Sequence, residues 1–252
     1  MLDTKEVYRK SEFCRWVQRT GLDNEERFLI AKYLDPKKRT LEAGSGGGRI
    51  LLAMHANGFE HLSGFDILPE FVEAARERDD SGTIDYRVQD GRALAYDDGS
   101  FDQLVYLQQF LSVVGAAEDR RKAIAEAFRV LRPGGRIVIS LLCMRGRKRR
   151  YWPLLAWLQL LRTVTFRQLS NQHQPWLRLN NAPHFKALID RGPYVYWYHE
   201  QEAVALFRDA GFVVEALGSE AQIDARHLAS PPAVPRHEPF RGVLYMVCQK
   251  PA

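Results

Sequence analysis

The chain has 252 residues, 46% hydrophobic and 27% charged, with a formal net charge of +5. This length buries a full core and favours a single α/β domain with an insertion, whereas so small a charge excess does not by itself indicate a polyanionic partner. Three scattered cysteines without metal-ligand spacing predict no metal site and a reduced, cytoplasmic setting. The first six residues contain acids and no apolar stretch, which excludes an ordinary secretory signal.

Residues 1–37 are predicted to form an N-terminal helical cap. Their apolar side chains recur at helical spacing, first around Phe13, Trp16 and Val17, and then from Phe28 to Tyr33. We expect this cap to cover the ligand-binding end of the domain that follows.

Glycines recur at every second position between residues 44 and 48, after a short apolar stretch and before an apolar-periodic one. This pattern predicts a strand, a tight turn and a helix, because a backbone that folds against a ligand needs residues without a Cβ. A dinucleotide fingerprint would require its third glycine at Arg49, and no phosphate-binding lysine motif is present. The turn is therefore predicted to hold neither a nicotinamide dinucleotide nor a triphosphate.

Two acids follow the next two predicted strands. Asp66 ends the second strand, where a carboxylate can accept both ribose hydroxyls of a nucleoside, and Asp90 ends the third, where it can accept the adenine amino group. The glycine turn and the two acids are therefore expected at one edge of the same sheet.

Strand and helix patterns alternate along the rest of the chain, which predicts a parallel sheet covered on both faces. The strands are predicted at residues 61–66, 84–90, 101–107, 136–142, 212–217 and 243–248. The helices between them are predicted at residues 49–57, 69–78, 119–131 and 200–210, with a turn at 132–135.

Five separated motifs agree in order and spacing with one family. They are the run at 41–50, Phe65-Asp66-Ile67, Val88-Gln89-Asp90-Gly91, Gly99-Ser100-Phe101-Asp102, and residues 130–135. Together they resemble the class I S-adenosylmethionine-dependent methyltransferases over residues 38–142 and again over the last forty or so. The resemblance implies a Rossmann-like, seven-stranded, mostly parallel sheet with helices on both faces and an antiparallel last strand, built from residues 38–142 and 195–252.

The same resemblance implies S-adenosylmethionine as cofactor and S-adenosylhomocysteine as product, and it assigns the contacting positions. Those on the methionine side are Glu42, Ala43, Gly44, Ser45 and Gly46. Those at the ribose and adenine are Asp66, Ile67, Asp90 and Gly91. Those near the sulfonium and the acceptor are Leu107 and Gln108.

Residues 143–194 form an insertion that a minimal fold does not need, and we expect it to act as a substrate lid. A basic run at 145–150 leads into a helix with Leu154, Trp157, Leu158 and Leu161 on one stripe. The first interpretation is a lid helix packed on the core. The alternative is peripheral membrane contact through residues 145–166, too short to span a bilayer, whereas nucleic-acid binding is disfavoured.

Methyl transfer by in-line displacement needs mainly a nucleophile held close and aligned in a dry site. Where a base is needed, His184 and His199 are the first candidates, ahead of His173 and Asp97. The string Leu107-Gln108-Gln109-Phe110 lacks the Pro-Pro of DNA adenine and cytosine N-methyltransferases, and no Pro-Cys pair supplies a cytosine-C5 nucleophile.

The sequence thus predicts a methyltransferase acting on oxygen or nitrogen of a small acceptor of natural-product, sugar or lipid-like type. Methylation of a protein or RNA group through the basic insertion is the alternative within enzymes. A cofactor-binding interaction protein without turnover is the alternative from another class. The sequence leaves open the acceptor and its reacting atom, and the oligomeric state.

Overall fold

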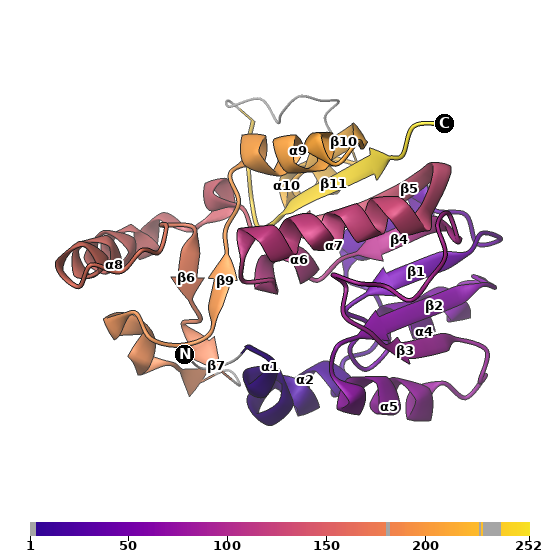
Figure 1. Ribbon diagram of the computed structural model, residues 1–252, viewed down its shortest axis with the longest axis horizontal. Helices are drawn as coiled ribbons and strands as arrows, with labels where there is room; N and C mark the ends of the chain where they lie inside the picture. The colour runs from indigo at the N-terminus through magenta and orange to yellow at the C-terminus, as the bar shows by residue number, and fades with distance from the viewer. Residues whose placement is uncertain (1–3, 180–181, 227, 229–237) are drawn as a thin grey trace.

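The computed structural model describes residues 4–179, 182–226, 228 and 238–252. A seven-stranded sheet in the order β10-β11-β5-β4-β1-β2-β3 forms its centre (Figure 1). Its strands are β1 (Thr40–Ala43), β2 (Leu62–Asp66), β3 (Asp85–Val88), β4 (Phe101–Tyr106), β5 (Leu131–Leu141), β10 (Val213–Gly218) and β11 (Leu244–Gln249).

Five adjacent strands, from β3 to β5, run parallel, and β11 is antiparallel to both of its neighbours. The predicted seven-stranded, mostly parallel sheet with an antiparallel last strand is therefore confirmed.

Helices cover both faces because successive side chains of a strand point to opposite sides. On one face, Leu104 and Tyr106 of β4 share a core with α6 (Phe110–Val113), α7 (Ala117–Val130) and α9 (Glu200–Asp209). On the other, Val105 faces a core that includes α3 (Asn24–Tyr33), α4 (Arg49–Ala56), α5 (Pro69–Arg78) and α10 (Glu220–Asp224). This double cover explains why every residue of β4 is buried.

The N-terminal segment is helical but interrupted. It consists of α1 (Thr4–Val7), a π-helical turn η1 (Tyr8–Glu12), α2 (Phe13–Gln18) and then α3. A capping box at Asp23 begins α3, since the Asp23 amide donates to Glu26 Oε2 at 2.8 Å. Phe13 of α2 packs on Phe71 of α5 with ring centroids 5.0 Å apart, which holds this segment over the end of the sheet.

The insertion forms a separate group of small elements that projects from the sheet on the side where α1 also lies (Figure 1). It contains the short helices η2 (Met144–Gly146), η3 (Arg149–Tyr151) and η4 (Phe185–Ile189), the helix α8 (Trp152–Val164), and the strands β6 (His173–Pro175), β7 (Arg178–Leu179), β8 (Ala182–Pro183) and β9 (Tyr194–Tyr196). β6 pairs with β9 and β7 with β8, both antiparallel. β9 therefore pairs within the insertion rather than with the central sheet, while the division of the chain into domains stays a prediction.

The fifth strand begins earlier than predicted. β5 starts at Leu131, directly after α7, and passes through the stretch at 132–135 that was expected to form a turn. Leu131 pairs with Phe101, and the Gly134 amide donates to the Lys250 carbonyl at 2.9 Å. The end of the chain thus supplies partners that the local sequence could not reveal.

Within the residues that the structure describes, no helix has the length and apolarity needed to cross a membrane.

Candidate functional site

The glycine turn between β1 and α4 has positive φ angles, which residues with a Cβ rarely adopt. Gly44, Gly46 and Gly48 have φ values of 64°, 52° and 77°. A Cβ at Gly44 would lie 2.8 Å from Cδ2 of Phe110, and one at Gly48 would lie 2.6 Å from the Tyr86 hydroxyl oxygen. The turn is therefore shaped so that its backbone can lie close to a ligand and to neighbouring rings.

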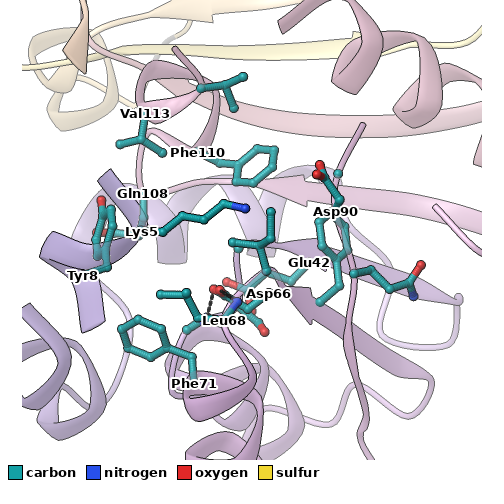
Figure 2. Close-up of a pocket in the computed structure, with 18 of the residues that line it drawn as sticks. Lys5, Tyr8, Glu42, Asp66, Leu68, Phe71, Asp90, Gln108, Phe110 and Val113 are labelled. Atoms are coloured by element: carbon teal, nitrogen blue, oxygen red, sulfur yellow. Dashed lines mark hydrogen bonds between the residues drawn. The ribbon is translucent and has the colours of Figure 1, made fainter. Parts of the chain in front are cut away.

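Asp66 leaves the end of β2 and holds the glycine turn in place. Its Oδ2 accepts the Gly46 amide and its Oδ1 accepts the Leu68 amide, both at 3.0 Å (Figure 2). Burial raises the pKa of this carboxyl, while the backbone amides oppose the shift. The carboxylate lines the cavity described below, on the same side as the turn.

Glu42, in β1, is the least satisfied acid of the site. It is only 4% exposed, and its Oε2 has no hydrogen-bond partner. Burial raises the pKa of this carboxyl well above its ordinary value, although the Arg49 guanidinium acts in the opposite direction. A buried acceptor left without a donor is costly, so this position suits a ligand that brings a positive charge or an N–H group.

A buried ion pair stands beside Glu42. Arg49 Nη2 lies 2.6 Å from Glu26 Oε1, its Nη1 lies 2.8 Å from Oε2, and Nη1 also donates to the Gly21 carbonyl at 2.7 Å. Gln108 donates to Glu26 and accepts from Arg19 Nη1 at 3.2 Å. This network links α3, α4 and the segment after β4, where Gln108 and Gln109 both adopt positive φ.

The acid after β3 is held by an arginine. Arg92 contacts both Asp90 oxygens, with Nε 3.0 Å from Oδ1 and Nη2 2.6 Å from Oδ2, and its Nη1 lies 3.0 Å from Asp119 Oδ2. This hydrogen-bonded guanidinium lowers the pKa of Asp90. Asp90 lies at the cavity as predicted, but Arg92 engages the carboxylate, which has lone pairs left for only part of a ligand contact.

One cavity of about 430 Å³, a size typical of small-molecule sites, is lined by Glu42, Arg49, Asp66, Asp90 and Arg92. Of the residues predicted to contact a cofactor, all but one line it; they are Glu42, Gly44, Ser45, Gly46, Asp66, Ile67, Asp90, Gly91, Leu107 and Gln108. The exception is Ala43, the last residue of β1, whose side chain is buried in the core on the face covered by α6, α7 and α9.

The cavity also has wall residues that were not predicted to contact a cofactor. Lys5 and Tyr8 reach it from the N-terminal helices, and Phe71, Phe110 and Val113 line it from α5 and α6 (Figure 2). Trp16 lines it as well. The prediction of an N-terminal cap over the ligand end was the signal available, but periodicity could not say which side chains turn inward.

The histidines named as candidate bases lie elsewhere. His199 is exposed and caps the start of α9, where its amide donates to Glu202 Oε2 at 3.2 Å. His184 Nδ1 lies 3.0 Å from the Trp176 carbonyl within the insertion. His173 has its pKa lowered by burial, and neither it nor Asp97 lines the cavity. In the described part of the chain, no three His, Cys, Asp or Glu side chains form a metal-binding cluster.

The part of the chain that carries this site is similar to known proteins. Residues 41–139 match the family model of a methyltransferase domain. A ubiquinone/menaquinone biosynthesis C-methyltransferase of Desulfotalea psychrophila is 32% identical over 44% of this chain and 45% of its own. A probable tRNA methyltransferase 9B of Mus musculus is 30% identical over 56% and 30%.

A solved S-adenosylmethionine-dependent methyltransferase from Methanosarcina mazei superposes with a TM-score of 0.67 at 21% identity, covering 88% of this chain and 97% of that one. This similarity establishes the fold. The chain spans between 30% and 60% of the lengths of the first curated relatives that it matches.

Proposed function

We propose that the protein is a class I S-adenosylmethionine-dependent methyltransferase and that it transfers a methyl group to oxygen or nitrogen of a small-molecule acceptor, as the match of residues 41–139 to a methyltransferase domain supports. The observation that carries the proposal is the cavity itself. It joins Glu42, whose Oε2 has no partner, and the Asp66 carboxylate, on one side, to an apolar wall that includes Phe110 and Val113.

The residues present fit the cofactor. The buried, unpartnered Glu42 Oε2 suits an ammonium group, and the Gly44 turn leaves space that a Cβ would occupy. Asp66 keeps lone pairs beyond its two amide contacts with which to accept ribose hydroxyls.

When bound, the cofactor supplies an electrophilic methyl group on a sulfonium. The chain's own residues then have to align the acceptor and exclude water. Leu107 and Phe110 provide apolar surface next to Gln108, and the N-terminal helices contribute Tyr8 and Trp16. Burial raises the pKa of Tyr8, so its hydroxyl is held neutral and acts as a hydrogen-bonding group rather than as a base.

A catalytic role for His184 or His199 stays a proposal that requires the residue to move toward the cavity, because neither lines it. An acceptor whose proton leaves readily does not need them. The pH profile of turnover in His184→Ala and His199→Ala tests this point: loss of the acidic limb, where a base would be protonated, assigns the base, and an unchanged profile removes both residues.

An RNA group as acceptor is the second candidate, favoured by the basic composition of the insertion and by the likeness to a probable tRNA methyltransferase.

A cytoplasmic location remains part of the proposal and is supported by the free thiols of Cys143 and Cys248, both buried.

Calorimetric titration with S-adenosylmethionine tests the function. We expect wild-type protein to bind, Asp66→Ala to lose binding, and Asp80→Ala, which removes an exposed acid, to bind as wild type. Label transfer from the cofactor into a metabolite extract or into RNA then separates the acceptor classes. Absence of binding by the wild-type protein would leave only the fold and refute the proposed activity.

A further inference from the structure

Helix α8 is apolar on its outer side as well as on its inner side. Leu158 is buried, yet Trp152, Trp157, Leu160 and Val164 are 60%, 50%, 57% and 66% exposed. A helix that is hydrophobic all round normally lies inside a protein or in a membrane. With 13 residues α8 is too short to cross a bilayer. Its exposed outer face therefore indicates a contact with something other than the interior of a membrane or of this protein.

A second element continues this apolar area. Phe185, Leu188 and Ile189 of η4 are 75%, 48% and 53% exposed. The indole Nε1 of Trp157 donates to the Leu188 carbonyl at 2.8 Å, so η4 lies against α8. We call the exposed apolar residues of α8 and η4 together the α8–η4 surface, and it lies at the end of the molecule that projects from the sheet (Figure 1).

The α8–η4 surface is braced from within. Arg162 of α8 binds Asp190, directly after η4, through Nε at 2.9 Å and Nη2 at 2.7 Å, and Asp190 is fully buried. Arg162 also donates to the carbonyls of Ser170 and His173. Paired and buried charges of this kind fix two elements in one arrangement, so the exposed apolar residues are held as one surface.

The charge of the insertion is one-sided. Residues 143–194 contain ten Lys and Arg and a single acid, Asp190, although the whole chain has a net charge of only +5. Because Asp190 is buried against Arg162 and Arg167, no carboxylate of this segment offsets the exposed basic residues Lys148, Arg149 and Arg150. The rest of the chain is therefore net acidic, and the positive charge gathers where the apolar surface is.

We infer that the α8–η4 surface docks the protein on an anionic lipid surface. Exposed Trp, Leu and Val side chains beside clustered Lys and Arg are what an interfacial helix uses: the apolar groups enter the acyl boundary and the basic groups meet anionic headgroups. Nucleic acid matches the charge but not the aliphatic residues Leu160, Val164 and Ile189, which have no base to stack on.

The insertion that carries this surface also contacts a wall residue of the cavity. Trp176, directly after β6, packs edge-to-face on Tyr8, with ring centroids 5.3 Å apart, and Tyr8 lines the cavity. Docking would bring the site to the source of a lipid-like acceptor; that role rests on the proposed function, whereas docking itself does not.

Co-sedimentation of the full chain with vesicles tests the inference, using phosphatidylcholine alone and phosphatidylcholine mixed with phosphatidylglycerol. We expect binding to the mixed vesicles and much weaker binding to phosphatidylcholine. The triple variant Lys148→Gln, Arg149→Gln, Arg150→Gln should bind on the order of a hundredfold more weakly, at about fivefold per basic residue. The triple variant Trp152→Ser, Leu160→Ser, Val164→Ser should lose a comparable factor, and this loss should persist in high salt.

The controls remove matched groups elsewhere. Lys38→Gln, Arg121→Gln, Lys122→Gln takes away three exposed charges, and Val213→Ser takes away an exposed apolar side chain; both should bind vesicles as wild type. Thermal unfolding and S-adenosylmethionine titration of every variant show whether the fold and the cofactor site are intact.

The outcomes separate the two proposals. Wild-type protein that stays in the supernatant with the mixed vesicles, or variants that sediment as well as wild type, would overturn docking whatever the cofactor titration gives. Salt-sensitive binding to RNA without binding to vesicles would overturn it in favour of a nucleic-acid surface. Vesicle binding without cofactor binding would refute the proposed function and leave docking standing.

Discussion

Replacing Glu42 by Gln should change stability and cofactor affinity in opposite directions. The carboxyl is buried in β1, its Oε2 has no partner, and burial raises its pKa well above the ordinary value. A group whose folded pKa is raised contributes stability below its unfolded pKa and loses it as pH rises toward the folded pKa. Above the unfolded pKa, burying Glu42 is therefore a cost, because folding must either take up a proton or bury a charge, and Gln, which does not titrate, relieves it.

The size of the gain follows from the burial. An unsatisfied buried polar group costs about 1–3 kcal/mol, and a neutral amide is cheaper to bury than a carboxylate. We expect Glu42→Gln to raise the free energy of unfolding of the cofactor-free protein by about 1 kcal/mol at pH 7. The gain should disappear in acid, below the unfolded pKa of about 4.3, where wild-type Glu42 is protonated in both states.

Affinity should fall at the same time. If Glu42 receives the ammonium of the cofactor, the variant loses a hydrogen bond to a charged group, worth about 1.5–3 kcal/mol, or roughly tenfold to hundredfold in Kd. Wild-type binding near neutral pH should also release protons, because an approaching cation lowers the raised pKa of Glu42, and the variant should release fewer.

Urea unfolding across pH and calorimetry in buffers of different ionisation enthalpy measure these effects. Unchanged affinity in Glu42→Gln would show that no cationic group binds there. Reduced stability at pH 7 would show that the carboxylate is satisfied in solution and that the reasoning from its burial is wrong.

Two further substitutions probe the framework of the site. Arg49→Met leaves Glu26 buried without its partner and should lower the free energy of unfolding by about 3–5 kcal/mol. Glu26→Gln combined with Arg49→Met should recover part of that loss, and equal melting temperatures of the two variants would contradict a coupled pair. Gly44→Ala should lower the free energy of unfolding by more than the roughly 1–2 kcal/mol typical of a left-handed residue, and should weaken cofactor binding, because its Cβ would contact Phe110. Gly58→Ala, with φ of 86° and open surroundings, should show only the backbone cost, and equal losses of stability at both positions would exclude the steric argument.

Much of the fold was predictable because its signals are local. A glycine turn such as that at Gly44 requires positive φ, and Pro69 marks the first turn of α5 where it was predicted. Acids that follow parallel strands meet at one sheet edge whatever the rest of the chain does, so Asp66 and Asp90 could be placed together in advance. The start of β5 was missed because Lys250, from the other end of the chain, supplies its hydrogen bonds.

The site itself was predicted in kind but not in detail. Periodicity identified an N-terminal cap, but only packing turned Tyr8 and Trp16 into the cavity. Spacing could not show that Arg92 holds Asp90, because side-chain pairing depends on rotamers and neighbours rather than on sequence separation.

The sequence by itself determined the order of strands and helices, the glycine turn and the acids at the strand ends, because these depend on backbone conformation and on the period of apolar residues. Tertiary structure alone decided which buried polar groups lack a hydrogen-bond partner and which apolar side chains stay exposed to solvent. It buried Glu42 beside an ion pair between Glu26 and Arg49, and it left the outer face of α8 in solvent. Burial is a property of the packed molecule, and it sets the pKa of a carboxyl and the exposure of an apolar helix.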